Sequence, residues 1–246
     1  MSTGDLSYET LDHMFDNSEY QELYTRLEAE LTITSAAQAE AGESDSEEDV
    51  ELLWRFARVC YSMHTENKAD KKAAEAYLRL AIDAAKQGMR LDEGHFAPHK
   101  WYAIALGGLG GYVSTKEKIG YAYEIREHAD KALELKPGDS ATLHLIGRWC
   151  FDVAGIGWAT RKIASMLFAT PPESSFDEAL TFFEQARDAL PDDAKNTFPE
   201  NDLFIGNTLL KLSRKADARA AFQAAVDAPI KGADGQRIHD EAAKQL

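Results

Sequence analysis

An apolar spacing of four and then three residues, ending on alanine, recurs four times along the chain. The four triplets are Ala74–Leu78–Ala81, Ile125–Ala129–Ala132, Ala179–Phe183–Ala186 and Ala218–Phe222–Ala225. Residues at this spacing share one stripe of a helix, where small side chains let a neighbouring helix approach closely. Ala, Leu, Glu and Lys dominate these segments, and no run alternates with the period of a strand. The pattern therefore predicts an all-α protein built from paired helices.

Each of these helices is preceded by a second helix with a matching face. The preceding segments have residues mostly spaced by three, one and three, and all of these residues except Arg58 are apolar or small: Trp54–Ala57–Arg58–Tyr61, Trp101–Ile104–Ala105–Gly108, Leu143–Ile146–Gly147–Cys150 and Ile205–Gly206–Leu209. This spacing is typical of helix A of a tetratricopeptide repeat, and the alanine-ended triplets are typical of helix B. Because the two patterns alternate in order, the sequence predicts a tetratricopeptide-like solenoid of stacked antiparallel helix hairpins.

The predicted repeats are longer than the standard repeat. The last alanine of each helix B recurs after 51, 54 and 39 residues, against about 34 in a standard tetratricopeptide repeat. Capping-box sequences at Ser114–Glu117 and Ser175–Glu178 indicate where two helices begin after the extra residues. The third repeat is therefore predicted to contain an inserted helix, within residues 152–172.

Two regions flank the repeats, and together they predict the domain organisation. Residues 1–35 form an N-terminal helical hairpin that turns at Asp16-Asn17-Ser18, and residues 36–49 form an acidic linker that ends in ESDSEED. Residues 50–246 form the repeat domain, with a C-terminal capping helix over 234–246. Such a cap is expected because the last repeat would otherwise leave an apolar face exposed.

The inserted segment is basic and aromatic in an otherwise acidic chain. We expect Ile163, Met166 and Leu167 to face the repeats, which leaves Arg161 and Lys162 exposed to a partner. We favour a structural role, in which this helix packs across the repeats and thickens the core. In the functional alternative, the same helix walls one side of the groove and presents Arg161 and Lys162 to an acidic partner.

Two serines of the acidic linker have the spacing that acid-directed kinases favour. Ser44 precedes Glu47 by three residues, and Ser46 precedes Asp49 by the same number. Both are candidate phosphorylation sites, which would add charge beside the first repeat. The alternative is an unmodified, solvated linker.

Composition limits the functions that such a chain can have. A net charge of −15 disfavours a general affinity for nucleic acid or for anionic membranes. The two cysteines, Cys60 and Cys150, lie in predicted helices and form no metal-ligand pattern, so we expect them to be buried and reduced. No catalytic or phosphate-binding motif, cofactor site or metal site is predicted. The absence of a long apolar run or a signal-peptide pattern predicts a cytoplasmic protein without a transmembrane segment.

Three stretches resemble the regulator of microtubule dynamics family: WYAIALGGLGGYVSTKEKI, HADKALELKPGDSATLHLIGRWCF and LFATPPESSFDEALTFFEQA. The resemblance covers about residues 50–246. It implies a non-enzymatic protein of the cytoskeleton that associates with microtubules, spindles and spindle poles and acts in chromosome segregation. It also implies an alternative, because some members carry an N-terminal membrane anchor, tether organelles and bind phospholipid. No anchor is recognised here, which favours the microtubule-associated role.

The register of the helix A segments predicts which residues line the concave groove of the solenoid. With the inserted helix, the candidate partner-binding residues are Arg55, Arg58, His99, Tyr102, His144, Arg148, Arg161, Lys162 and Asn207. A groove with arginines could bind an acidic peptide tail or a phosphate headgroup. For Arg148, the alternative is an ion pair with a carboxylate of a neighbouring helix.

Three functional hypotheses remain open at this point. Binding to the acidic microtubule surface requires a basic cluster, for which Arg55, Arg58, Arg148, Arg161 and Lys162 are candidates, or else a bridging partner protein. Phospholipid binding or transfer predicts an apolar pocket gated by Trp158 and Phe168. A peptide-binding scaffold predicts an open groove with Arg and Asn pointing into it.

Overall fold

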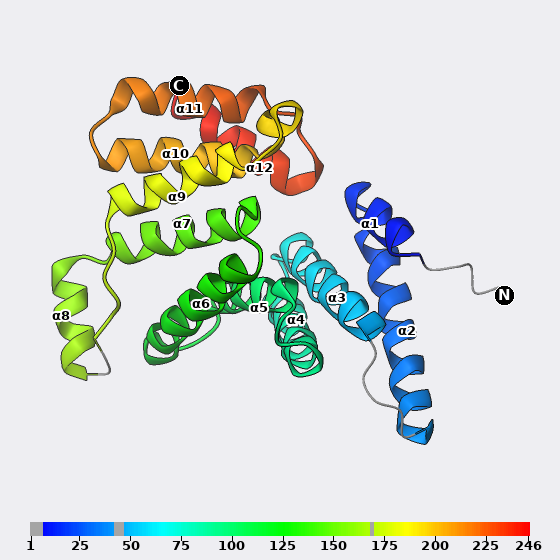
Figure 1. Ribbon diagram of the computed structural model, residues 1–246. Coiled ribbons are helices and arrows are strands. Elements are labelled where there is room, and N and C mark those ends of the chain that lie inside the picture. Colours follow the sequence, from blue (N-terminus) through cyan, green and yellow to red (C-terminus); the bar gives the residue numbers. More distant parts are fainter. Residues whose placement is uncertain (1–6, 42–46, 168–169) are drawn as a thin grey trace. The chain divides into compact units, whose positions relative to one another are not determined.

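The computed structural model describes residues 7–41, 47–167 and 170–246, and within these ranges the chain is all-α with no strand (Figure 1). The chain divides into two compact units, Met1–Tyr112 and Val113–Leu246. The first unit contains α1 (Tyr8–Asp16), α2 (Tyr20–Ala41), α3 (Glu47–Glu66), α4 (Lys71–Leu91) and α5 (Phe96–Leu109). The second contains α6 (Thr115–Leu135), α7 (Ser140–Ala154), α8 (Trp158–Leu167), α9 (Phe176–Asp188), the 3-10 helix η1 (Asp192–Thr197), α10 (Pro199–Lys211), α11 (Lys215–Asp227) and α12 (Gly232–Ala243).

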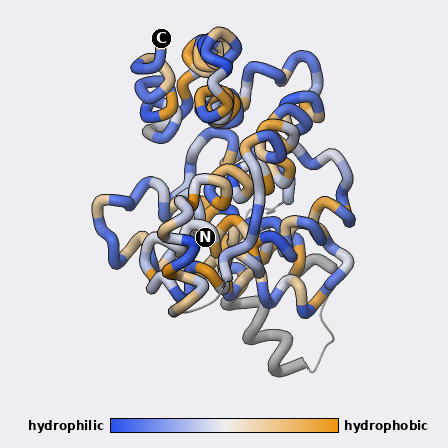
Figure 2. The backbone as a smooth tube through the Cα atoms, turned by 90° about the vertical axis from the view of Figure 1, so that its left-hand side faces the viewer, coloured by the Kyte–Doolittle hydropathy of each residue, from blue (hydrophilic) through white to orange (hydrophobic). Residues whose placement is uncertain are grey.

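Three of the four helix hairpins that the repeat pattern predicts are present. The strongest helix pairs are α3 with α4, α7 with α9, and α10 with α11, which are the first, third and fourth predicted repeats. The two helices of the second predicted repeat, α5 and α6, belong to different units. Figure 2 shows hydrophobic and hydrophilic residues interspersed along the coloured helical turns, as expected for helices that bury one stripe. The predicted tetratricopeptide-like fold is therefore confirmed.

Two glycines explain how closely the paired helices pack. A Cβ atom on Gly147 of α7 would lie 2.7 Å from Phe183 Cδ1 of α9, and one on Gly206 of α10 would lie 2.5 Å from Phe222 Cε1 of α11. Both phenylalanines are buried and are the middle residues of the predicted triplets. Since only glycine leaves room for each ring, helix A and helix B pack at short range.

The additions to the repeats lie mostly where the sequence places them. The inserted helix is α8, between α7 and α9, and α12 packs on α10 and α11 as a C-terminal cap. Ser114 and Glu117 form a complete capping box at the start of α6. At α9, Ser175 accepts a hydrogen bond from the Glu178 amide, but the Glu178 carboxylate accepts from the Ser174 hydroxyl instead.

The N-terminal region differs in part from the prediction. The turn after α1 lies at Asn17 and Ser18, as predicted, and Ser18 adopts a φ of 62°. Helix α2, however, continues to Ala41 and α3 begins at Glu47, so part of the predicted linker is helical. Ser44 and Ser46 lie outside the described residues. The predicted division into hairpin, linker and repeat domain stays a prediction.

Candidate functional site

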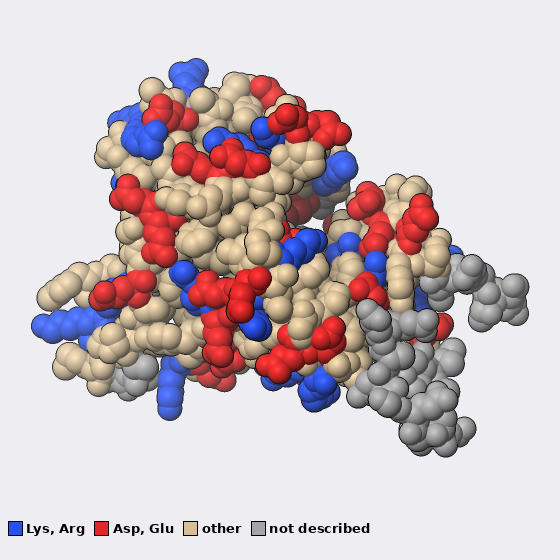
Figure 3. Space-filling view, in the orientation of Figure 1, with Lys and Arg blue, Asp and Glu red and all other residues tan. Residues whose placement is uncertain are grey.

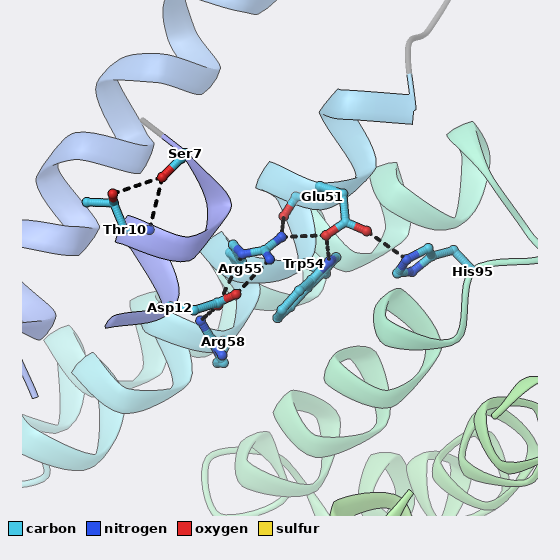
Figure 4. A network of polar contacts seen from close by, with 8 residues as sticks. All are labelled: Ser7, Thr10, Asp12, Glu51, Trp54, Arg55, Arg58 and His95. Atoms are coloured by element: carbon cyan, nitrogen blue, oxygen red, sulfur yellow. Dashed lines mark hydrogen bonds and ion pairs between the residues drawn. The ribbon is translucent and has the colours of Figure 1, made fainter. Parts of the chain in front are cut away.

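The two arginines of α3 are held by a carboxylate of α1 (Figure 4). Arg55 donates from Nη2 to Asp12 Oδ2 at 2.8 Å and from Nε to Asp12 Oδ1 at 3.1 Å. Arg58 pairs with the same carboxylate, and Arg55 also pairs with Glu51 one turn earlier on α3. Ser7 caps the start of α1 by accepting a hydrogen bond from the Thr10 amide, two residues before Asp12. Local capping thus orients the helix that presents Asp12 to α3.

Aromatic rings cover both guanidinium groups. The Cζ atom of Arg55 lies 4.2 Å from the ring centroid of Trp54 and 4.6 Å from that of Tyr8. The Cζ atom of Arg58 lies 4.0 Å from the ring centroid of Phe15. A cation that lies over the face of an aromatic ring is attracted to it electrostatically, so these contacts stabilise both guanidinium groups. The arginines therefore attach α1 to α3 by charge and by ring contact together.

The positive and negative charges of this cluster balance one another. Burial alone would raise the pKa of Asp12, but the hydrogen bond from Arg55 and the charge of Arg58 outweigh it and lower that pKa. Burial likewise raises the pKa of Glu51, but the hydrogen bond from Arg55 lowers it, and the net effect is a lowered pKa. Because two carboxylates face two guanidinium groups, Arg55 and Arg58 add no net positive charge to this surface.

The candidates on α5 are buried. His99 is 5% exposed and its Nε2 lies 3.1 Å from the Glu93 carbonyl oxygen, while Tyr102 is also 5% exposed. His95 caps α5 through a hydrogen bond from the Ala97 amide to Nδ1, and its Nε2 lies 3.0 Å from Glu51 Oε1. These contacts give the histidines structural partners. Within the described ranges, no group of three or more His, Cys, Asp or Glu residues is arranged to hold a metal ion.

In the second unit, His144 lies inside the helix packing. It is buried between the rings of Phe183 and Phe198, with centroids 5.4 Å and 4.7 Å away. Its Nδ1 lies 2.9 Å from Asn201 Oδ1, and Asn201 donates to the Phe183 carbonyl oxygen. This network assigns the proton to Nδ1, which donates to Asn201. Burial lowers the pKa of His144, so the ring is neutral in the folded protein.

Arg148 is half-buried and pairs with a carboxylate of a neighbouring helix. Its Nη1 donates to Glu200 Oε1 of α10 at 2.9 Å, and its Cζ atom lies 3.8 Å from the ring centroid of Phe204. Its Nε is buried without a hydrogen-bond partner. This is the ion pair that the sequence allowed as an alternative. Asn207, on the same helix as Glu200, is half-buried.

The orientation predicted for the inserted helix is wrong. Arg161 is half-buried and donates to the carbonyl oxygens of Val153, Pro171 and Pro172 at 3.1, 3.1 and 2.6 Å. Met166 is 76% exposed, and Ile163, also predicted to face the repeats, is 57% exposed. A guanidinium group needs several acceptors, and the backbone turns that flank α8 supply them. Arg161 therefore attaches the helix to its own unit, and Ile163 and Met166 face outward. The side chain of Leu167, the third residue predicted to face the repeats, is outside the described part of the structure.

The other candidates of this segment divide between exposed and undescribed residues. Lys162 is exposed, with its ammonium 5.1 Å from the ring centroid of Trp158. Trp158, proposed as a gate for a lipid pocket, is 75% exposed. Phe168, the other gate residue, lies outside the described residues. Trp158 is thus not folded over the described part of the unit.

One charged cluster, around Arg126, was not predicted from the sequence. Arg126 of α6 donates from Nε to both carboxylate oxygens of Asp130 at 2.9 Å and from Nη1 to Glu178 of α9 at 3.2 Å. Its Cζ atom lies 5.1 Å from the ring centroid of Trp149. The spacing of Arg126 and Asp130 by one helical turn was the only signal for it in the sequence. Like the Arg55 cluster, it joins helices.

The cysteines are buried thiols. Cys60 and Cys150 are both free and fully covered, and burial raises the pKa of each thiol, to about 11 for Cys150. A raised pKa keeps the sulfur protonated and a weak nucleophile at neutral pH. Neither thiol is placed for catalysis.

The charged surface is mixed in sign. On the face seen in Figure 3, Lys and Arg side chains are interspersed with Asp and Glu side chains within each unit. In the part of the chain that the structure describes, none of the helices has the length and apolar character needed to cross a bilayer. The arrangement favours binding of a partner by small local patches.

Comparison with known proteins places these features in a family. The family described as regulator of microtubule dynamics protein 1-3 matches residues 8–246. Regulator of microtubule dynamics protein 1 of Pongo abelii is 40% identical over 199 residues, which are 81% of this chain and 62% of that protein. The protein of the same name from Bos taurus is 36% identical over 238 residues, which are 97% of this chain and 69% of that protein.

A solved structure supports the fold alone. A thermophilic TPR protein of Thermus thermophilus superposes with a TM-score of 0.56 at 16% sequence identity, covering 97% of this chain and 100% of that one. The chain spans about three fifths to two thirds of the length of the two mammalian relatives. From the match over residues 8–246, the chain belongs to the regulator of microtubule dynamics family.

Proposed function

We propose that this chain is a non-enzymatic, microtubule-associated protein that acts at the spindle and its poles and in chromosome segregation. The observation that carries the proposal is the family match over residues 8–246, together with relatives named regulators of microtubule dynamics. Its place in the cell is then the cytoplasm and its cytoskeleton. The helix hairpins supply binding surfaces, and the buried, protonated thiols agree with a role without catalysis.

Charge determines how a microtubule could be bound. The microtubule surface is acidic and this chain carries −15, so long-range attraction works against the encounter. Arg55 and Arg58 are neutralised by Asp12 and Glu51. Among the candidates of the second unit, Lys162 is exposed and Arg148 is 35% exposed beside Glu200. We infer that direct binding depends on these two cations, and that a bridging protein is required if they do not suffice.

The test is co-pelleting of the purified chain with microtubules over a salt series. We expect pelleting at low salt that weakens as salt screens the charges. Arg148→Glu and Lys162→Glu should each weaken it, whereas Lys211→Glu, an exposed lysine at the end of α10, serves as the matched control. If the chain stays in the supernatant at low salt, direct binding is rejected and a bridging partner is required. A fluorescent fusion that never concentrates on the spindle in dividing cells would reject the spindle role.

A further inference from the structure

Helix α8 has its apolar face turned to water. Trp158, Ile163 and Met166 are 75%, 57% and 76% exposed, the most exposed large apolar side chains of the described ranges. At about 100° per residue, Trp158, Lys162 and Met166 lie within about 80° of one another, and Ile163 extends the same face. In a usual surface helix of a globular protein this stripe would pack on the core. Here it is available to a partner.

The opposite face of α8 fastens the helix to its unit. Ala164 is 5% exposed, and Arg161, one turn before it, donates to the three backbone carbonyl oxygens of residues 153, 171 and 172. Within the described ranges, α8 has no extensive packing with another helix. Figure 1 shows it standing off to one side of α7 and α9. The exposed face is therefore a ridge, held from behind by a single polar side chain.

The charge of this segment is opposite to that of the chain. Residues 153–172 contain Arg161 and Lys162 and no acidic residue, although the chain has 42 Asp and Glu residues in 246. The Lys162 ammonium lies over the Trp158 ring at 5.1 Å, so cation and apolar ring share one surface. Tryptophan and lysine in this arrangement suit a boundary between apolar chains and anionic headgroups.

We propose that α8 docks on the surface of an anionic lipid bilayer. Trp158, Ile163 and Met166 enter the boundary between headgroups and acyl chains, and Lys162 extends to the lipid phosphates. A bilayer is favoured over a protein because the exposed side chains of α8 project as a ridge beside a lysine, and a fluid anionic surface adapts to a ridge. Helix α8 has ten residues, fewer than the roughly 20 needed to cross a bilayer, so the contact that it makes is peripheral. The proposal does not depend on the microtubule role.

The test is flotation of the purified chain with vesicles of phosphatidylcholine, with and without phosphatidylserine. We expect flotation with the anionic vesicles and a loss of affinity of about tenfold or more in Trp158→Ser/Met166→Ser. Ile230→Ser is the matched control, because Ile230 is 48% exposed in the same unit but distant in sequence. Lys162→Glu should weaken binding to the anionic vesicles only.

A second measurement locates the contact. Vesicles with brominated acyl chains should quench tryptophan fluorescence in the wild type and much less in Trp158→Phe, because Trp54, Trp101 and Trp149 are covered or half-covered. Three results would overturn the proposal: no flotation of the wild type, equal flotation of the Trp158→Ser/Met166→Ser variant, or absence of quenching. Self-association without vesicles that the same variant abolishes would assign the face to a second copy of the chain instead.

Discussion

The ring of Phe183 fills the space in which residue 147 would carry a side chain. A Cβ atom on Gly147 would stand 2.7 Å from both Cδ1 and Cε1 of that ring. Phe183 is completely buried, so the ring has no free space into which to move. The distance between α7 and α9 is thus determined by one glycine and one phenylalanine.

Gly147→Ala should destabilise the protein by about 1–3 kcal/mol, because the added methyl group forces two packed helices apart. The gain in helix propensity of about 1 kcal/mol opposes this loss without cancelling it. Gly120→Ala is the control: it is an exposed helical position with nothing within 4 Å of the added Cβ, so it should be neutral or stabilising. Urea unfolding measures both. Equal stability of the two variants would contradict the close-packing argument.

Asp12→Asn should lower the free energy of unfolding by about 1 kcal/mol at neutral pH, since the buried Arg55 and the half-buried Arg58 lose a shared carboxylate that is itself partly exposed. The lowered pKa of Asp12 means that its contribution is present above the unfolded-state pKa, about 3.9. It is lost as the pH falls through the lower folded-state pKa. The difference between wild type and variant should therefore shrink in acid.

Denaturant unfolding of the wild type and Asp12→Asn near pH 7 and near pH 3 tests whether the difference in their free energies of unfolding shrinks in acid. Asp192→Asn serves as the control, because Asp192 pairs with Lys195 in an exposed ion pair and should change stability less. A difference that grows in acid would show that Asp12 does not act through its charge.

His144 should make stability depend on pH. Its pKa is lowered by burial, so the unfolded chain takes up a proton first, below about pH 6.5. The free energy of unfolding should then decrease as the pH is lowered, by at most about 1.4 kcal/mol per pH unit for this one group. Asp202 acts with the opposite sign, because burial raises its pKa to about 6 and its contribution is lost as the pH rises.

The contribution of His144 is therefore measured as the difference in the free energy of unfolding between the wild type and His144→Phe. Asp202 and His64, whose pKa values are also shifted by burial, are common to both proteins, so their effects largely cancel. We expect the difference to narrow as the pH falls from about 7 to 5. A difference that is constant over this range would show that His144 is not held neutral.

Arg161→Met should loosen α8 without unfolding its unit. The variant keeps most of the side-chain length but loses the donors to residues 153, 171 and 172. Limited proteolysis should cut faster between α7 and α9, with little change in the thermal midpoint, because α8 packs weakly on the other described helices. Lys162→Met, at an exposed neighbouring position, is the control. Equal protease resistance of wild type and Arg161→Met would rule out the fastening role.

The helix pairs could be predicted because their determinants are local. The spacing around Phe183 and Phe222 indicates which stripe of each helix is buried. Gly147 and Gly206 indicate where the paired helix approaches closely. Helix periodicity carries this information within one or two turns. The inserted helix and the C-terminal cap followed from the same reasoning.

The candidate site could be predicted only in part, since its partners are distant in sequence. Arg55 looked available because Asp12 lies 43 residues earlier, and no local pattern connects them. The orientation of α8 was missed for a related reason. Burial of Ile163 and Met166 competes with the need of Arg161 for acceptors, and the acceptors are backbone atoms that a sequence does not display.

Those backbone acceptors have a consequence for mutational tolerance. Every residue type carries a carbonyl oxygen, so substitutions at 153, 171 or 172 leave the acceptors of Arg161 in place as long as the backbone keeps its path. The hydrogen-bonded attachment of α8 described above thus depends on the identity of one residue, Arg161. Substitutions at these three positions are therefore tolerated by this contact, whereas a single change at Arg161 removes all three hydrogen bonds.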